Sequence, residues 1–411
     1  MNLSSKNHSS IIGAALFAFL IACQIAFAGE LLPQAPPPGV SAASAILIDA
    51  ATGQVLYEKN ARERRAIAST TKIMTGLLAA ERCAPDDIVT VNKDILTTNG
   101  SMLGLRPGEQ YTVDALMKAL LLKSANDSAV ALADHMAGSI PNFARLMNQR
   151  AAQLGAHESH FVNPHGLFDP QHYSTAYDLA LISREAMKDG WFRNLVGTKI
   201  CSIVLPDGKE QPLINHNRLL FRNDNVDGIK TGYVKQAGRC LVASQSRGGW
   251  RLIAVVLNSG DLWSDSEALL NYGFDNWQAT IFARIDRPVT TARVFGGREG
   301  RIDVIATQEL AEVLPKGMAN RTKVKFKLHR LVAPVQPGQE VGQALLLQDG
   351  KQIATASLLA NDGTNPTWWL TTSRVLGKII LTLTILVAGL KGYGKAAKIA
   401  RRRRRRLQAE S

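Results

Sequence analysis

Strand patterns lie at both ends of the first 280 residues, and helical patterns fill the interval between them. Residues 44–60 predict two short strands around the turn Asp49–Gly53, which is a hairpin. Helical patterns occupy 69–82, 112–122, 127–137, 141–155 and 174–190, strand patterns occupy 198–205, 238–246 and 251–259, and a last helix follows at 265–277. Because strands and helices do not alternate regularly, this order predicts one sheet with helices packed on it rather than a parallel βαβ sheet.

The first 28 residues are typical of a secretory signal peptide. Lys6 precedes a long apolar run that ends in the small-x-small sequence Ala26–Ala28. The sequence ending at Cys23 also resembles a lipoprotein box, but the apolar run continues past it, so we favour cleavage after Ala28. A Pro-rich linker, residues 29–41, leads into the body of an exported chain.

Three cysteines, Cys83, Cys201 and Cys240, remain after cleavage, so a single disulfide leaves at least one thiol unpaired. We favour free, buried cysteines. The sequence contains no C-x-x-C pair or Cys/His cluster of zinc-binding spacing, and we expect neither metal nor cofactor.

The composition changes near Phe282. Residues 282–367 show short strands separated by Gly, Pro and Asp turns, which predicts a small all-β domain after a first domain at 42–281. Two turn sequences, Pro337–Gly338 and Asp349–Gly350, lie at hairpin spacing.

The C-terminal segment predicts a membrane anchor, residues 368–392, and a polybasic tail, residues 393–411. Residues 374–411 contain 11 of the 48 Lys and Arg residues and one acid, so +10 of the formal charge of +14 lies there. The body is therefore only mildly basic, and we expect no nucleic-acid partner. A helix lying in the membrane interface, with Arg374 and Lys378 as its polar stripe, is the alternative to a spanning helix.

Three short motifs carry the candidate chemistry. Ser69 and Lys72 are one helical turn apart, so a lysine could remove the serine proton if burial lowers its pKa. Ser124 and Asn126 stand at a helix start, and Lys230-Thr231-Gly232 stands at the edge of a strand. Taken alone, Ser69, Thr70 or Ser124 would be read as helix caps, with Lys72 solvated. His165 is a second candidate base, although a hydrogen-bonded turn explains it more simply.

The order S-x-x-K, S-x-N, K-T-G resembles the motif set of penicillin-binding proteins and class A β-lactamases. The stretches STTKIMTGLLA, NPHGL, DGIKTGY and LLNYGF extend the resemblance to the low-molecular-mass penicillin-binding proteins of the D-alanyl-D-alanine carboxypeptidase family, serine peptidase family S11. The resemblance implies an α/β (α+β) transpeptidase-like domain with a central antiparallel sheet flanked by helices, an all-β stalk and an anchor. It also implies peptidoglycan stem peptides as substrate, β-lactams as covalent inhibitors, and a location on the outer, periplasmic side of the cytoplasmic membrane.

The resemblance also assigns roles to residues of this sequence. It implies that Ser69 is the acylated nucleophile, Lys72 its base and Ser124 a proton relay, with no metal or cofactor. Asn126, Lys230, Thr231 and Gly232 would bind substrate, and the backbone N–H groups of Ser69 and Tyr233 would form the oxyanion hole. Lys72 is then expected to be buried, with a lowered pKa.

Three departures from the family pattern stand out. Ile67 replaces a frequent proline, Ala125 replaces a frequent glycine, and the arginine that often precedes LLNYGF is missing. Arg251 or His216 is the expected replacement for that carboxylate contact.

Three rival functions remain open on the sequence. A β-lactamase would use a glutamate of E-x-x-L-N, but Glu267 of EALLN follows K-T-G instead of preceding it. A peptidoglycan DD-endopeptidase and a non-catalytic β-lactam sensor or wall-binding protein are the others.

Overall fold

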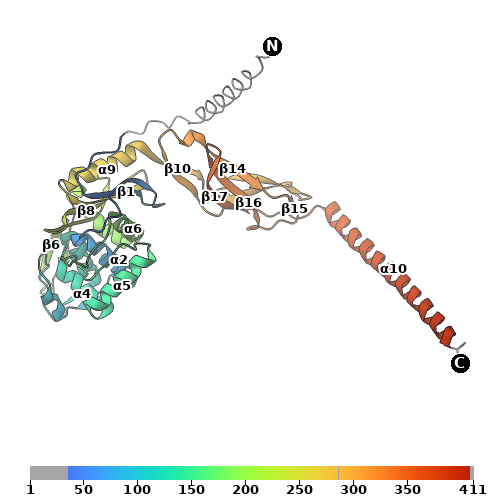
Figure 1. Ribbon diagram of the computed structural model, residues 1–411, viewed down its shortest axis with the longest axis horizontal. Coiled ribbons are helices and arrows are strands. Elements are labelled where there is room, and N and C mark those ends of the chain that lie inside the picture. Colours follow the sequence, from blue (N-terminus) through green and yellow to red (C-terminus); the bar gives the residue numbers. More distant parts are fainter. Residues whose placement is uncertain (1–35, 286, 408–411) are drawn as a thin grey trace, which may run out of the picture. The chain divides into compact units, whose positions relative to one another are not determined.

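The structure is a computed structural model that describes residues 36–285 and 287–407 (Figure 1). The predicted signal peptide and the first part of the predicted linker, to residue 35, lie outside the described residues. Contacts divide the chain into two compact units, one running to Ala279 and including Val313–Lys316, the other formed by Thr280–Glu312 and the chain from Gly317 onward.

A five-stranded antiparallel sheet, in the order β2-β1-β9-β8-β7, forms the centre of the first unit. Its strands are β1 (Ser44–Asp49), β2 (Val55–Lys59), β7 (Val226–Val234), β8 (Gly238–Arg247) and β9 (Trp250–Ser259). β1 from the start of the unit pairs directly with β9 from its end, so the predicted single sheet and the predicted hairpin are confirmed.

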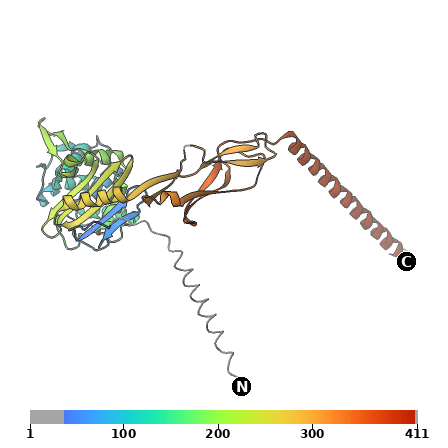
Figure 2. The ribbon, with the colours of Figure 1, turned by 90° about the horizontal axis from the view of Figure 1, so that it is seen from above.

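Both faces of this sheet are covered because apolar residues point alternately to either side of each strand. Ile46 and Ile48 of β1 join a core with helices α2 (Lys72–Arg82), α4 (Asn126–Ala137) and α6 (Ala176–Ala186). Ala45 and Leu47 join the opposite core with α9 (Leu262–Asn276), which lies across the strands in Figure 2 (yellow).

The contact between α9 and the sheet depends on a glycine of the LLNYGF stretch. A Cβ atom at Gly273 would lie 2.4 Å from Leu252 Cδ1 and 2.8 Å from Leu47 Cδ2. The helix therefore packs closer to the sheet than any side chain at this position would allow.

The remaining helices and small sheets surround these layers. They are α3 (Val113–Lys118), α5 (Ile140–Gln153), α7 (Gly190–Gly197) and α8 (Leu219–Arg222), with the strand pairs β3 (Ile88–Thr90) and β4 (Gln110–Thr112), and β5 (Ile200–Val204) and β6 (Glu210–Ile214). The strand predicted at 198–205 thus forms a separate hairpin instead of joining the central sheet. The helix predicted at 112–122 divides into α3 and the π-helical η3 (Ala119–Lys123).

The second unit is all-β, with a six-stranded sheet in the order β14-β16-β17-β12-β11-β15. The strands are β11 (Thr290–Phe295), β12 (Arg301–Ala306), β14 (Thr322–Leu328), β15 (Leu331–Val332), β16 (Glu340–Gln348) and β17 (Lys351–Ala360). β10 (Trp277–Ala283) and β13 (Leu310–Pro315) form a separate pair. Asp349–Gly350 closes the β16–β17 hairpin, as predicted. Pro337–Gly338 does not close a hairpin, because β15 pairs with β11 and not with β16.

The chain ends in a long helix, α10 (Trp368–Leu407). Its segment Trp368–Ala400 is long and apolar enough to cross a membrane, with a mean hydropathy of 1.8 in its most apolar window. Leu370 is buried in the core of the second unit, and Trp369 packs edge-on against Phe295.

Candidate active site

Ser69 lies in a short 3₁₀ turn, η1 (Ala68–Thr71), that runs directly into α2. No side chain caps either helix start, so the interpretation of Ser69 or Thr70 as a helix cap is wrong. Thr70 instead donates its hydroxyl hydrogen to the Ile67 carbonyl at 2.6 Å. Ala68 has a φ of 49°, a left-handed conformation that is uncommon for alanine.

Two neighbouring segments pack closely on this turn. A Cβ atom at Gly232 of β7 would lie 2.9 Å from the Ser69 amide nitrogen, and one at Gly166 would lie 1.9 Å from the Ala68 carbonyl oxygen. Neither glycine can carry a side chain without moving the turn. The sequence explained Gly232 by the approach of substrate, whereas the structure shows it contacting the turn that holds Ser69.

The Lys72 amine contacts three uncharged polar groups. It donates to Asn126 Oδ1 at 2.6 Å and to the His165 carbonyl at 2.8 Å, and its nitrogen lies 3.0 Å from Ser69 Oγ, so the lone pair of a neutral amine can face the serine hydroxyl. The side chain is completely buried, although it begins a helix. The predicted burial of Lys72 is therefore confirmed, and its interpretation as a solvated lysine is wrong.

The surroundings of Lys72 disfavour its charged form. Burial, together with the positive charge of Lys230, lowers the pKa of Lys72 well below its usual value, and Asp127 opposes the shift. Lys72 can therefore accept a proton from the hydroxyl 3.0 Å away.

Ser124 stands between η3 and α4 in a left-handed conformation, with φ of 63°. The N-cap of α4 is Ala125, which makes no side-chain capping bond, so Ser124 does not cap the helix as a simple interpretation of the sequence would have it. Its hydroxyl is nearly buried and makes no hydrogen bond within residues 36–285 and 287–407. Ala125 has φ of −64°, a conformation that requires no glycine.

Asn126 connects the lysine to the loop before α3. Its side-chain amide donates to the Asn99 carbonyl while its oxygen accepts from Lys72. The next residue, Asp127, accepts backbone N–H groups of Leu103, Gly104 and Leu105 at 2.8–3.0 Å. Sequence reasoning did not single out Asp127, since an acid in the first turn of a helix is ordinary.

Lys230, Thr231, Gly232 and Tyr233 follow one another on β7, the edge strand of the central sheet. Lys230 is buried, and burial lowers its pKa to about 7. Its amine donates to the Thr231 carbonyl at 3.2 Å. Thr231, Gly232 and Tyr233 line a cavity of about 730 Å³.

His165 contributes its carbonyl rather than its ring. Its Nδ1 accepts the Leu167 N–H, and burial with the nearby charge of Lys72 lowers its pKa to about 3. His172, which sequence reasoning missed, accepts the Val162 N–H on Nδ1, so Nε2 carries the proton and donates to Thr71 Oγ1 at 2.8 Å. Both histidines are neutral supports of the Ser69 turn.

The structure excludes one of the two expected replacements for the missing arginine. Arg251 pairs with Asp227 at 2.9 Å, near the end of β9 opposite to the cavity, so Arg251 as the replacement is wrong. His216 does line the cavity. So do Arg218 and Arg239, which the sequence did not indicate because neither belongs to a motif.

Other sequence predictions concern residues outside this cluster. Glu267 lies on α9, whose core covers the face of the sheet opposite to α2, which agrees with a chance match to the β-lactamase motif. Cys83, Cys201 and Cys240 are all free, as favoured, but only Cys240 is buried, and the expected burial of Cys83 and Cys201 is wrong.

Comparisons with known proteins show the family to which the chain belongs. The family model described as D-alanyl-D-alanine carboxypeptidase matches residues 32–261, and the model of the C-terminal domain of penicillin-binding protein 5 matches residues 278–364. The D-alanyl-D-alanine carboxypeptidase DacD of Escherichia coli is 36% identical over 363 residues, covering 84% of this chain and 92% of that protein. DacF of Bacillus subtilis is 34% identical over 331 residues, covering 78% of this chain and 85% of that protein.

A solved structure has a similar fold. The crystal structure of penicillin-binding protein 5 from Haemophilus influenzae matches with a TM-score of 0.68 and 30% identity, covering 80% of this chain and 99% of that chain. The chain therefore belongs to the D-alanyl-D-alanine carboxypeptidase family, serine peptidase family S11, the group of penicillin-binding proteins that its motifs resemble.

Proposed function

We propose that this chain removes the terminal D-Ala from peptidoglycan stem pentapeptides through an acyl-enzyme on Ser69, and that β-lactams acylate the same serine. The observation that carries the proposal is the buried Lys72 amine, 3.0 Å from Ser69 Oγ and with a lowered pKa. Family membership supports the reaction class, and the geometry supports the roles proposed for individual residues.

In the acylation step, the neutral Lys72 amine takes the hydroxyl proton as Ser69 Oγ attacks the carbonyl carbon of the penultimate D-Ala. The C–N bond then breaks, and the departing D-Ala amine takes a proton relayed through the Ser124 hydroxyl, which is free of other hydrogen bonds in the described chain. The backbone N–H groups of Ser69 and Tyr233 stabilise the oxyanion. Deacylation repeats these steps with water in place of the serine hydroxyl.

Lys230 and Thr231 bind the terminal carboxylate, and Asn126 binds the backbone of the substrate. Arg239 and Arg218 line the same cavity as Thr231. Arg239 lies opposite Tyr233 in the β7–β8 ladder and donates to the Gly260 carbonyl at 3.0 Å, just before α9. Its guanidinium therefore occupies the region where the family arginine is missing. The Arg218 side chain makes no ion pair or hydrogen bond among the residues described.

The domain organisation and location follow the same proposal. Residues 42–281 form the catalytic domain and 282–367 the β-rich stalk, in line with the two family matches. The chain is exported and is held by α10 with its body outside. Three features support a spanning anchor: the apolar length of α10, the pair Trp368 and Trp369 at its start, and the basic run near its end.

Replacement of the serine or its base should abolish acylation. We expect Ser69→Ala to eliminate labelling by a fluorescent penicillin and release of D-Ala from a pentapeptide. Lys72→Arg should lower both by at least about 100-fold although the charge is kept, because guanidinium cannot act as a base. The full chain in detergent is compared by gel fluorescence and D-Ala assay with Lys123→Arg as the control. A wild-type chain that neither labels nor releases D-Ala contradicts the proposal.

Lys230 should produce the alkaline limb of the pH profile. Its pKa of about 7 in the free enzyme means that its positive charge is lost as pH rises past this value, and carboxylate binding weakens. A bound carboxylate raises that pKa, so kcat/KM should fall above about pH 7 while kcat persists to higher pH. Lys230→Arg should remove the alkaline limb. Coincident profiles of kcat and kcat/KM would exclude this role.

Arg239 should act on substrate binding rather than on chemistry. Loss of a charged hydrogen bond to the carboxylate is worth about 1.5–3 kcal/mol, so Arg239→Ala should raise KM about 10-fold or more with kcat little changed. Arg218→Ala is measured in parallel. Arg145→Ala is the matched control, since Arg145 lies on α5 and donates to Asn142, away from the cavity lining. If neither Arg239→Ala nor Arg218→Ala changes KM, the arginines do not grip the carboxylate.

The anchor predicts a defined topology. A spanning α10 places the basic tail in the cytoplasm, so protease added outside sealed cells should leave residues 393–411 intact and digest them only after lysis. An epitope after Ser411 reports the cleavage by immunoblot, and a tag on the body serves as the accessible control. Cleavage of the tail in sealed cells would instead favour a helix lying on the outer face of the membrane.

A further inference from the structure

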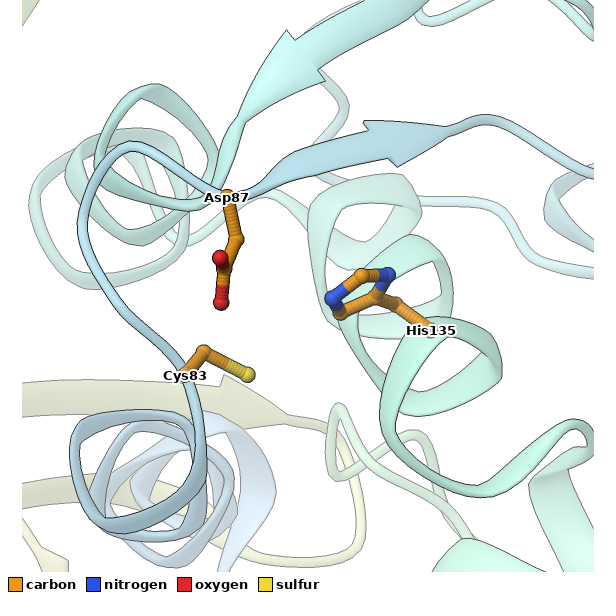
Figure 3. A group of neighbouring side chains, drawn as sticks. All are labelled: Cys83, Asp87 and His135. Atoms are coloured by element: carbon orange, nitrogen blue, oxygen red, sulfur yellow. The ribbon is translucent and has the colours of Figure 1, made fainter.

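A group of potential metal ligands lies away from the catalytic residues. Figure 3 shows Cys83, Asp87 and His135 with their side chains directed toward one another. The thiol sulfur, a carboxylate oxygen and an imidazole nitrogen all lie within 4.8 Å of one another. Each comes from a different element: Cys83 ends α2, Asp87 precedes β3, and His135 lies in the last turn of α4.

Backbone hydrogen bonds hold the two ligands of the α2–β3 loop in place. The Cys83 N–H donates to the Ala79 carbonyl at 3.0 Å, which continues the helix to the cysteine. The Ala84 N–H donates to Asp87 Oδ2 at 2.8 Å, and the Asp87 carbonyl accepts from Val113 N–H at 2.9 Å. The carboxylate is therefore oriented by its own loop and does not depend on a metal for its position.

The chemistry of the three donors selects a class of cation. Thiolate, imidazole and carboxylate are the three side-chain ligands of Zn²⁺, whereas Ca²⁺ and Mg²⁺ take oxygen ligands. Cys83 and His135 also stand at the C-terminal ends of their helices, where the helix dipole favours a cation. A thiol left free in an exported chain would likewise be protected by a metal.

We propose that Cys83, Asp87 and His135 bind one Zn²⁺ ion, with water completing a tetrahedral shell. Coordination replaces the thiol proton, which passes to solvent, and involves no change of oxidation state. The ion would join the C-terminal ends of α2 and α4. These are the helices whose first residues, Lys72 and Asn126, share a hydrogen bond at the active site.

The proposed ion takes no part in the reaction. α2 has 11 residues and is about 16 Å long, so Cys83 lies one helix length from Lys72. A metal there would fix the separation of two helices at the end remote from the catalytic groups. The inference therefore does not depend on the proposed carboxypeptidase activity.

The test is direct metal binding to the full chain in detergent, purified without a histidine tag. We expect one Zn²⁺ per chain in competition with a chromophoric chelator, and a thiolate-to-cobalt charge-transfer band when Co²⁺ is the probe. Zinc at about 100 times its dissociation constant should raise the Tm by about 5 °C or more. Cys83→Ser, Asp87→Asn and His135→Gln should each abolish the stoichiometric site, and Cys83→Ser should abolish the cobalt band.

Matched controls are available for each ligand. Cys201→Ser, Asp86→Asn and His157→Gln change the same residue types outside the cluster and should bind zinc as wild type does. Fluorescent-penicillin labelling of every variant shows that the fold is intact and is expected to be unchanged. Absence of stoichiometric zinc in the wild type, or zinc binding that survives both Cys83→Ser and His135→Gln, overturns the proposal. Failure of penicillin labelling in the wild type would contradict the proposed carboxypeptidase activity and would leave the zinc proposal unaffected.

Discussion

Removal of the Ser69 hydroxyl proton by Lys72 requires an uncharged amine in a buried site, and the surrounding structure is consistent with that requirement. The acceptors of the Lys72 N–H groups, Asn126 Oδ1 and the His165 carbonyl, are neutral, whereas a carboxylate in either place would keep the amine protonated. Asp127 is close enough to raise the pKa of Lys72, but its oxygens are occupied by the backbone N–H groups of residues 103–105. The acid therefore shapes a loop while leaving the lysine able to act as a base.

Close packing keeps this arrangement in one conformation. The turn that holds Ser69 lies between β7 and the loop after residue 163, and Gly232 and Gly166 bring both segments to the backbone of the turn. His172 supports it from a third side through Thr71, whose hydroxyl donates in turn to the Ala68 carbonyl. The contacts of Gly232, Gly166 and His172 each join the turn to a residue more than 90 positions later in the chain. The left-handed Ala68 persists because its neighbours leave the turn no other conformation.

The sequence predicted what local pattern and spacing can specify. Short apolar runs in β1 and β9 indicated strands, and one helical turn between Ser69 and Lys72 indicated a candidate nucleophile with a candidate base. Long-range contacts were not accessible in this way. Asp127 binds backbone N–H groups of a loop more than 20 residues earlier, and His172 binds the Thr71 side chain. Arg239 is defined by its strand partner and by the loop before α9. The hydrophobic pattern of residues 198–205 predicted a strand but did not show that it forms a hairpin apart from the central sheet. Such a pattern does not specify which strand it pairs with.

The charges of the site favour a substrate that ends in a carboxylate. Lys72 and Lys230 are both buried, and burial lowers the pKa of each amine. Among the described residues, no carboxylate accepts a hydrogen bond from either amine. Asp261, which caps α9, gives the cavity lining one negative charge, whereas Arg218 and Arg239 give it two positive charges. A terminal carboxylate lowers the electrostatic energy of this cluster and restores the charge of Lys230. A peptide bond in the interior of a chain brings no such group, so its transition state lacks that stabilisation. The preference for the last residue of a stem peptide thus follows from the same lysine burial that makes the serine reactive.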